Sequence, residues 1–169
     1  MITQAEPYYL YYMATCSKTV ILFYILLHVT AATAQPRNIV FQKLDNYFLS
    51  DRAGLSGDVT CKVITKEKEF DKTFGVAKTM ANKIERPDFA TQQVVMIAMQ
   101  PTNKDARITI LSALKAGNYV EVFFKTSKDR FPLPYTTQPM SLAIIPKFKE
   151  VTKVKFYEGK RLVEEVSIK

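Results

Sequence analysis

Apolar and polar residues alternate along much of the chain with the two-residue period of β-strands. Residues 119–126 show this alternation, with charged Glu121 and Lys125 between apolar neighbours, although Phe123 interrupts it. Residues 93–99 are apolar at both parities, as in a strand covered on both faces, and are predicted to form the central strand. Further strands are predicted over residues 39–49, 59–65, 107–114, 140–145, 151–157 and 162–168, the last two as a hairpin.

A helical spacing is clear in one place, residues 66 to about 74, where Phe70 and Phe74 share a face. Thr65 is expected to cap the start of this helix, and Gly75 is expected to end it. About seven strands and one helix predict an α+β fold that is mostly antiparallel β. The expected architecture is a sandwich or a partly open barrel with the short helix packed on it.

The apolar run 19–29 has the organisation of a signal peptide. It is 11 residues long and follows Lys18, whereas a membrane-spanning helix needs about 20 residues. Ala32-Thr33-Ala34 forms a cleavage site, so residues 1–34 are expected to be removed and residues 35–169 to form one mature domain. Met13 is a better start than Met1, and an uncleaved anchor is the alternative. We expect an exported product, periplasmic or extracellular, without a membrane span.

Residues suited to nucleophilic or metal chemistry are scarce in the expected mature domain. The single histidine, His28, and one of the two cysteines, Cys16, lie in the export segment. Without an imidazole the mature domain has no Ser-His-Asp or Cys-His machinery and no histidine-ligated zinc. Cys61 has no partner for a disulfide and is expected to be a buried thiol. We therefore expect no catalysis, no cofactor and no metal site.

Two predicted loops carry candidate binding residues. One follows the central strand at 101–105, and the other, 127–139, holds three prolines. Proline stiffening lowers the conformational entropy lost on binding, and exposed aromatic side chains are suitable anchors. The alternative is that these side chains pack over an open edge of the sheet. The candidates are Pro101, Thr102 and Asn103 in the first loop and Phe131, Leu133 and Tyr135 in the second.

A second candidate site is basic. A regular strand around the last hairpin would present four lysines on one face, namely Lys147, Lys149, Lys153 and Lys155. With a formal net charge of +8, such a face suits an anionic polymer of the cell envelope. The alternative is that these lysines only solvate an outer sheet face. Nucleic acid is not expected as the partner, because no aromatic residues are interleaved for base stacking.

The order of elements resembles a known family. Pro87-Asp88-Phe89 precedes the central strand, and Thr137-Gln138-Pro139 leads into the apolar residues 142–147 and then Val154-Lys155-Phe156. Over about residues 66–157 this order resembles the C-terminal domain of the protease complex subunit PrcB family. The resemblance implies an exported, non-catalytic partner that supports a subtilisin-like protease. In one departure, Thr102-Asn103-Lys104-Asp105 replaces a Thr-Gly-Gly-Tyr-like turn, and a similar turn occurs in chagasin-type inhibitors of cysteine proteases.

The sequence therefore predicts an exported protein-binding domain that acts as an accessory or stabilising subunit, or as a modulator, of a secreted protease. Binding of anionic envelope polymers through the basic hairpin is the alternative. Salt distinguishes the two, because charge-driven binding weakens as ionic strength rises. No Asn-x-Ser/Thr sequon occurs in residues 35–169, which fits a bacterial source. The sequence leaves the partner's identity and the oligomeric state open.

Overall fold

The computed structural model describes residues 35–50, 54–77 and 84–168. The predicted export segment lies outside these described residues. The chain divides into Met1–Ala34 and a second unit, Gln35–Lys169. Both clusters of buried hydrophobic residues are formed by side chains of the second unit alone, so this unit has its own core.

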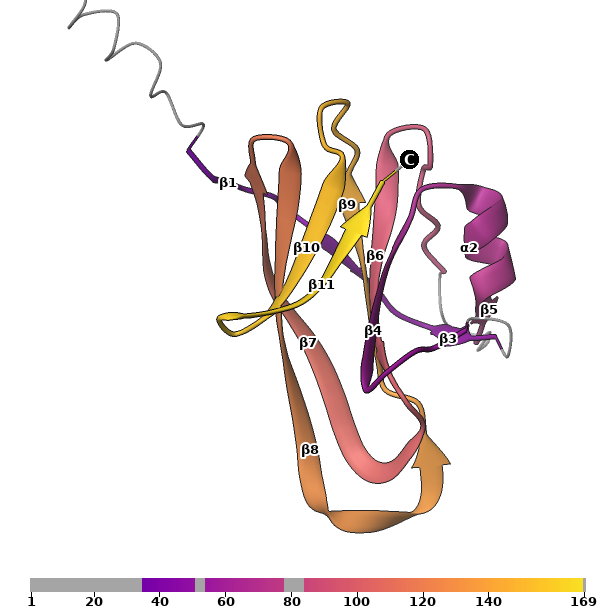
Figure 1. Ribbon diagram of the computed structural model, residues 1–169. Helices are drawn as coiled ribbons and strands as arrows, with labels where there is room; N and C mark the ends of the chain where they lie inside the picture. Colours follow the sequence, from indigo (N-terminus) through magenta and orange to yellow (C-terminus); the bar gives the residue numbers. More distant parts are fainter. Residues whose placement is uncertain (1–34, 51–53, 78–83, 169) are drawn as a thin grey trace, which may run out of the picture. The chain divides into compact units, whose positions relative to one another are not determined.

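The described residues form eleven strands and one helix, α2 (Glu67–Thr73) (Figure 1). The strands are β1 (Arg37–Asn38), β2 (Gln42–Leu44), β3 (Tyr47–Leu49), β4 (Val59–Ile64), β5 (Phe74–Val76), β6 (Gln92–Met99), β7 (Thr102–Ala116), β8 (Tyr119–Thr137), β9 (Met140–Pro146), β10 (Lys153–Glu158) and β11 (Arg161–Ser167). They make a five-stranded sheet, β1-β7-β8-β10-β11, a four-stranded sheet, β2-β9-β6-β4, and the small pair β3-β5. Every strand pair is antiparallel except β8–β10. The predicted α+β sandwich is confirmed.

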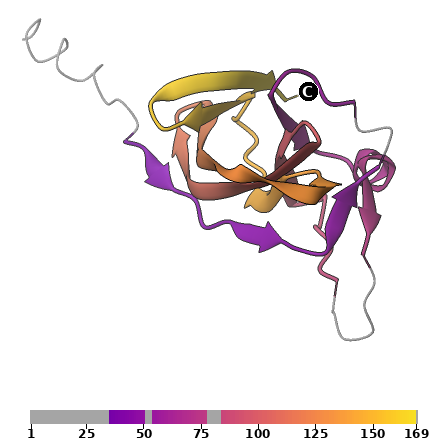
Figure 2. The ribbon, with the colours of Figure 1, turned by 90° about the horizontal axis from the view of Figure 1, so that it is seen from below.

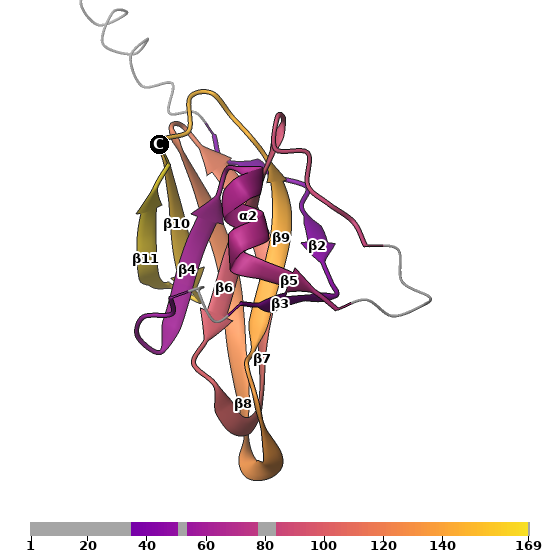
Figure 3. The same ribbon diagram turned by 90° about the vertical axis from the view of Figure 1, so that its right-hand side faces the viewer.

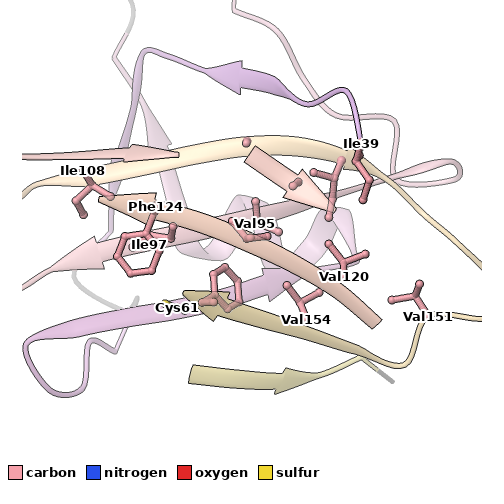
Figure 4. Close-up of a cluster of buried hydrophobic side chains, with 14 residues drawn as sticks. Ile39, Cys61, Val95, Ile97, Ile108, Val120, Phe124, Val151 and Val154 are labelled. Carbon is pink, nitrogen blue, oxygen red and sulfur yellow. The ribbon is translucent and has the colours of Figure 1, made fainter. Parts of the chain in front are cut away.

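The predicted central strand, β6, is confirmed between β9 and β4 and is buried on both faces. Val95 and Ile97 point into the cluster between the two large sheets (Figure 4). Val94 and Met96 belong to the other cluster, together with Phe70 of α2. The helix lies over this side of the four-stranded sheet (Figure 3). Because side chains alternate along a strand, apolar residues at both parities fill both clusters. The result is three layers: the five-stranded sheet, the four-stranded sheet, and α2 with the β3–β5 pair.

The predicted helix is confirmed, but its expected cap is not. Lys66 occupies the N-cap position without a side-chain hydrogen bond, so the expectation that Thr65 caps the helix was wrong. Phe70 and Phe74 lie on one face with ring centroids 4.9 Å apart, in the cluster beneath the helix. These two rings hold the helix against the sheet, and burial of apolar area supplies the stabilisation that a seven-residue helix lacks.

Gly75 has a different role from the predicted one. The helix ends at Thr73, and Gly75 lies within β5, paired with Phe48 of β3. A Cβ atom on Gly75 would stand 2.2 Å from the Phe48 Cζ. The glycine therefore allows the Phe48 ring to cover the strand, and the helix ends because the chain enters β5.

The predicted first strand, 39–49, is divided between two sheets, and β1 just before it belongs to a third (Figure 2). Its residues form β2 against β9 and β3 against β5, and β1, which precedes it, lies against β7. Ile39 enters the cluster between the sheets and Leu44 the cluster beneath α2, while Val40 between them is 92% exposed. The segment divides because its apolar side chains pack into two different clusters.

Candidate functional site

The two predicted binding loops are strands. β7 begins at Thr102 and β8 continues to Thr137, and the two are paired at Ala106↔Lys128 and Lys104↔Pro132. The expectation of loops was wrong because β8 pairs with β10 only as far as Phe124. Beyond that point the outer edge of β8 has no strand partner among the described residues, and an edge strand tolerates prolines that lack an N–H donor. We call residues 102–107 and 126–137 the ribbon end.

The ribbon end joins the two large sheets. The pair β6–β9 continues directly into the pair β7–β8, and between them the Met99 N–H donates to the Pro139 carbonyl at 2.9 Å. The register between β7 and β8 shifts twice here. Asp105 lies opposite three residues of β8, 129–131, and Asn103 lies opposite four, 133–136, so β8 has a bulge at each place. Such bulges bend a strand pair, and the ribbon turns here from one sheet to the other (Figures 1 and 3).

The two bulges place aromatic side chains in solvent. Phe131 lies in the first bulge and is 81% exposed, and Tyr135 lies in the second and is 59% exposed. Leu133 is half-buried. Pro101 and Asn103 on the opposite strand are exposed, whereas Thr102 is half-buried. The structure thus brings five of the six predicted residues into the ribbon end and Pro101 directly before it, and only the two aromatic ones are large, exposed and apolar.

The ribbon end is basic. Four cations and two carboxylates lie there: Lys104, Arg107, Lys128, Arg130, Asp105 and Asp129. Arg107 pairs with Asp105 at 3.0 Å, and this hydrogen bond raises the pKa of the guanidinium. The remaining positive charge suits an acidic partner surface.

A polar groove of about 380 Å³ adjoins the ribbon end and is lined in part by Pro101, Thr102 and Lys128. Glu158 in this groove accepts a hydrogen bond from the Thr126 hydroxyl and pairs with Arg161 at 2.7 Å. The Thr126 hydroxyl, and after it Arg161, lowers the pKa of the Glu158 carboxyl. The carboxylate of Glu158 is therefore already neutralised within the fold.

The predicted basic face is not assembled. β10 begins at Lys153, and Lys147 and Lys149 lie in the connection that precedes it. The Lys147 ammonium donates to the Thr65 carbonyl at 2.8 Å and to the Phe89 carbonyl. This lysine therefore ties the end of β9 to two other segments. Lys149 is exposed. The expectation of one basic strand face was wrong because the chain is not a regular strand between 147 and 152.

The other two lysines have acidic and aromatic neighbours. Lys153 pairs with Glu165 at 2.6 Å, and Lys155 lies 3.9 Å from the same carboxylate. Lys155 also stands 4.3 Å above the centre of the Tyr119 ring. Only two of the four predicted lysines therefore share a sheet face, and a carboxylate lies between them.

Cys61 is buried, as predicted, with 2% of its surface exposed. Burial raises the pKa of its thiol from the usual value near 9.0 to about 12, and the Glu164 carboxylate adds to the effect. The thiol stays protonated at neutral pH and is a poor nucleophile.

Within the part of the chain that the structure describes, no group of three histidine, cysteine or acidic side chains is placed to hold a metal ion. None of the described helices has the length and apolar character to cross a membrane.

Sequence reasoning missed the outer face of the five-stranded sheet. Phe123 and Tyr157 stack there with ring centroids 5.2 Å apart, and Leu111 and Leu162 are 52% and 48% exposed. The one signal in the sequence was Phe123, which interrupts the alternation of β8.

The resemblance to the PrcB family stays a prediction. No protein-family model, curated protein or solved structure matches the chain.

Proposed function

We propose that the chain is an exported, non-catalytic domain that binds a protein partner through the ribbon end. The observation that carries the proposal is the pair of exposed aromatic side chains, Phe131 and Tyr135, held out of the β-ladder by two bulges. Large exposed aromatic residues cost solubility unless a partner covers them, and they are the usual anchors of protein interfaces.

The energetics are adequate for a specific complex. Burying the two aromatic side chains contributes roughly 1.5–3 kcal/mol each, or about a hundredfold or more in affinity for the pair. Pro132 and Pro134 lie between them, and Pro134 restricts the backbone of the second bulge, which lowers the entropy lost on binding. The positive charge of the ribbon end adds electrostatic attraction to an acidic rim.

The partner that we propose is a secreted protease, for which this domain is an accessory or stabilising subunit or a modulator. The resemblance to the PrcB family supports this choice, and the predicted signal peptide supports an encounter in the periplasm or outside the cell. The buried, protonated thiol of Cys61 supports a role in binding and not in nucleophilic catalysis.

Affinity capture tests the proposal. The unit Gln35–Lys169 is immobilised, exposed to native cell-envelope and secreted fractions at moderate salt, and the retained proteins are identified by mass spectrometry. The double variant Phe131→Ser/Tyr135→Ser is compared with Val40→Ser, which alters an even more exposed apolar residue outside the ribbon end. A protease retained by the wild type and the control, but lost by the double variant, is the expected result.

Two outcomes contradict the proposal. A protease retained equally by the double variant would mean that the ribbon end is not the interface. Capture of polymer alone, released as salt rises, would move the function to the lysines of β10. Titration of the purified protease then gives the magnitude, with an expected loss of affinity of about a hundredfold or more for the double variant.

A further inference from the structure

The outer face of the five-stranded sheet carries an apolar row that crosses four strands. The strand registers pair Ser112 of β7 with Phe123 of β8, Phe123 with Tyr157 of β10, and Tyr157 with Leu162 of β11. Paired residues project from the same face of a sheet. Leu111 lies in the irregularity beside Ser112, where two residues oppose one. None of these side chains belongs to either buried cluster.

A charged row lies next to the apolar row. Glu121 of β8 is paired with Lys155 of β10, and Lys155 is paired with Glu165 of β11. One step further along the strands, Tyr119 is paired with Lys153. The two acidic and two basic residues of these rows balance each other, and Lys125, two residues beyond Phe123 on β8, is a further exposed cation of the same face.

We propose that this face binds the same face of a second copy of the chain. The two copies are related by a two-fold axis that lies in the interface, parallel to the strands and midway between β8 and β10. Such a rotation keeps each residue at its height along the strands and places β8 of one copy over β10 of the other. Phe123 then faces the Tyr157 of the second copy, and Leu111 faces its Leu162.

The charges agree with this arrangement. Under the same rotation Glu121 of each copy faces Lys155 of the other, and Tyr119 faces Lys153. In these two rows opposite charges and a cation–π contact therefore meet twice, and no like charges are opposed within them. A surface that matches itself under one rotation is what an isologous dimer requires.

Other occupants fit this face less well. An anionic polymer needs an excess of several cations, and Glu121 and Glu165 offset all but one of the cations on this face. A sugar needs the open face of an aromatic ring, but Phe123 and Tyr157 stack at an interplanar angle of 17°, so each ring covers one face of the other. A second copy uses the ring edges and the two leucines without these difficulties.

The size of the face sets the expected strength. Four strands about 4.8 Å apart and five residues about 3.3 Å apart span roughly 300 Å². A stable dimer buries about 800 Å² per partner, so we expect a reversible dimer with a dissociation constant in the range of about 1–100 μM. The proposal uses a surface separate from the ribbon end and does not depend on the proposed function.

Sedimentation equilibrium of the unit Gln35–Lys169 tests the proposal, at protein concentrations up to about 200 μM. The wild type is expected to show a monomer–dimer equilibrium. Leu162→Lys is expected to weaken it at least about tenfold, because a charge is buried at the apolar row. Val40→Lys and Phe131→Ser, which alter exposed apolar residues outside this face, are expected to leave it unchanged.

A mixing experiment tests the axis itself. Glu121→Lys alone opposes like charges twice in its own dimer, and so does Lys155→Glu alone, so each variant is expected to be monomeric. In an equimolar mixture the introduced lysine of one variant faces the introduced glutamate of the other, and heterodimers are expected to form. Association in the mixture also shows that both variants are folded.

Three results would overturn the proposal. The first is a wild type that stays monomeric over the whole concentration range. The second is a dimer that Leu162→Lys does not weaken, which would place the interface elsewhere. The third is a mixture of the two charge variants that associates no more strongly than either variant alone, which would exclude this axis.

Discussion

Glu164 connects the two large sheets at the edge where β11 contacts β4. β4 is the last strand of its sheet, so its outer backbone groups have no partner from a neighbouring strand of that sheet. The Cys61 N–H donates to the Glu164 Oε2 at 2.8 Å. The same carboxylate hydrogen-bonds to the Cys61 thiol. Replacing this one side chain therefore changes both the stability of the fold and the titration of the thiol.

We expect Glu164→Ala to lower the free energy of unfolding by about 2 kcal/mol, because it leaves a largely buried N–H donor without its charged acceptor. Glu164→Gln keeps an acceptor oxygen and loses only the charge, so we expect a loss of about 1 kcal/mol or less. Glu165→Gln is the matched control. It changes the adjacent carboxylate, which pairs with Lys153 on the solvent side, and its expected effect is within about 0.5 kcal/mol.

The thiol provides a second, independent readout. The native pKa of about 12 means that Cys61 is alkylated about a thousandfold more slowly near pH 8 than an unfolded cysteine with a pKa near 9.0. Burial remains in both Glu164 variants but the carboxylate is gone. The pKa of the thiol is therefore expected to fall while staying above its usual value, and alkylation is expected to accelerate in both variants but not in Glu165→Gln.

The sign of the pH dependence follows from the same pKa. Between about pH 9 and 12 the unfolded thiol is ionised and the folded thiol is not, so the folded state binds more protons and loses stability as pH rises. The slope from this one group is at most about 1.4 kcal/mol per pH unit. The difference in stability between wild type and Glu164→Gln isolates the share of this slope that the Glu164 carboxylate contributes, because the tyrosines, the lysines and the burial of the thiol are common to both chains. That difference should shrink between the lower thiol pKa of the variant and about pH 12.

Urea denaturation gives the stabilities, and the rate of iodoacetamide alkylation gives the thiol reactivity. A cost below about 0.5 kcal/mol for Glu164→Ala, or an unchanged alkylation rate in that variant, would show that the Glu164 carboxylate does not support the Cys61 N–H and thiol. Equal losses for the alanine and glutamine variants would show that the charge, and not the acceptor oxygen, carries the effect.

Three further predictions can be checked by urea denaturation. Lys147→Met removes an ammonium that joins two backbone carbonyls and should lower the free energy of unfolding by about 1–3 kcal/mol. Substitution of the exposed neighbour, Lys149→Met, should lower it by less than about 0.5 kcal/mol, and equal effects would contradict the role of Lys147. Gly75→Ala should cost about 1–2 kcal/mol by displacing the Phe48 ring, and it should cost less in a Phe48→Ala background; the same cost in both backgrounds would exclude that cause. Ser141→Ala should leave the stability unchanged or raise it by up to about 1 kcal/mol, because the buried Ser141 hydroxyl has no hydrogen-bond partner among the described residues; a loss above about 1 kcal/mol would reveal one.

Local patterns were sufficient for the elements whose environment is uniform along their length. β6 is apolar at both parities and lies between two buried clusters. The first part of β8, residues 119–126, alternates because only one of its faces is buried. The spacing of Phe70 and Phe74 predicted a helix because both rings pack on the same cluster. In each case the period of the side chains reports directly on the number of covered faces.

The candidate site was only partly accessible in this way. The aromatic residues Phe131 and Tyr135 could be chosen from composition, but their segment was expected to be a loop because prolines interrupt it. Whether a proline excludes a strand depends on how many neighbours that strand has, and β8 loses its second neighbour after Phe124. That information lies in β10, about thirty residues further along the chain.

Side-chain periodicity and residue type were enough to predict the fold class, the central strand, the helix and the burial of Cys61. Two features became known from the tertiary structure alone. The Lys147 ammonium donates hydrogen bonds to two carbonyls distant in sequence, and Phe123, Tyr157 and Leu162 form one row across the sheet. The physical reason is that register between strands is set by the packing of the whole sheet. A shift of one residue would send every side chain of a strand to the opposite face, and no local pattern specifies which residues of β8, β10 and β11 lie side by side.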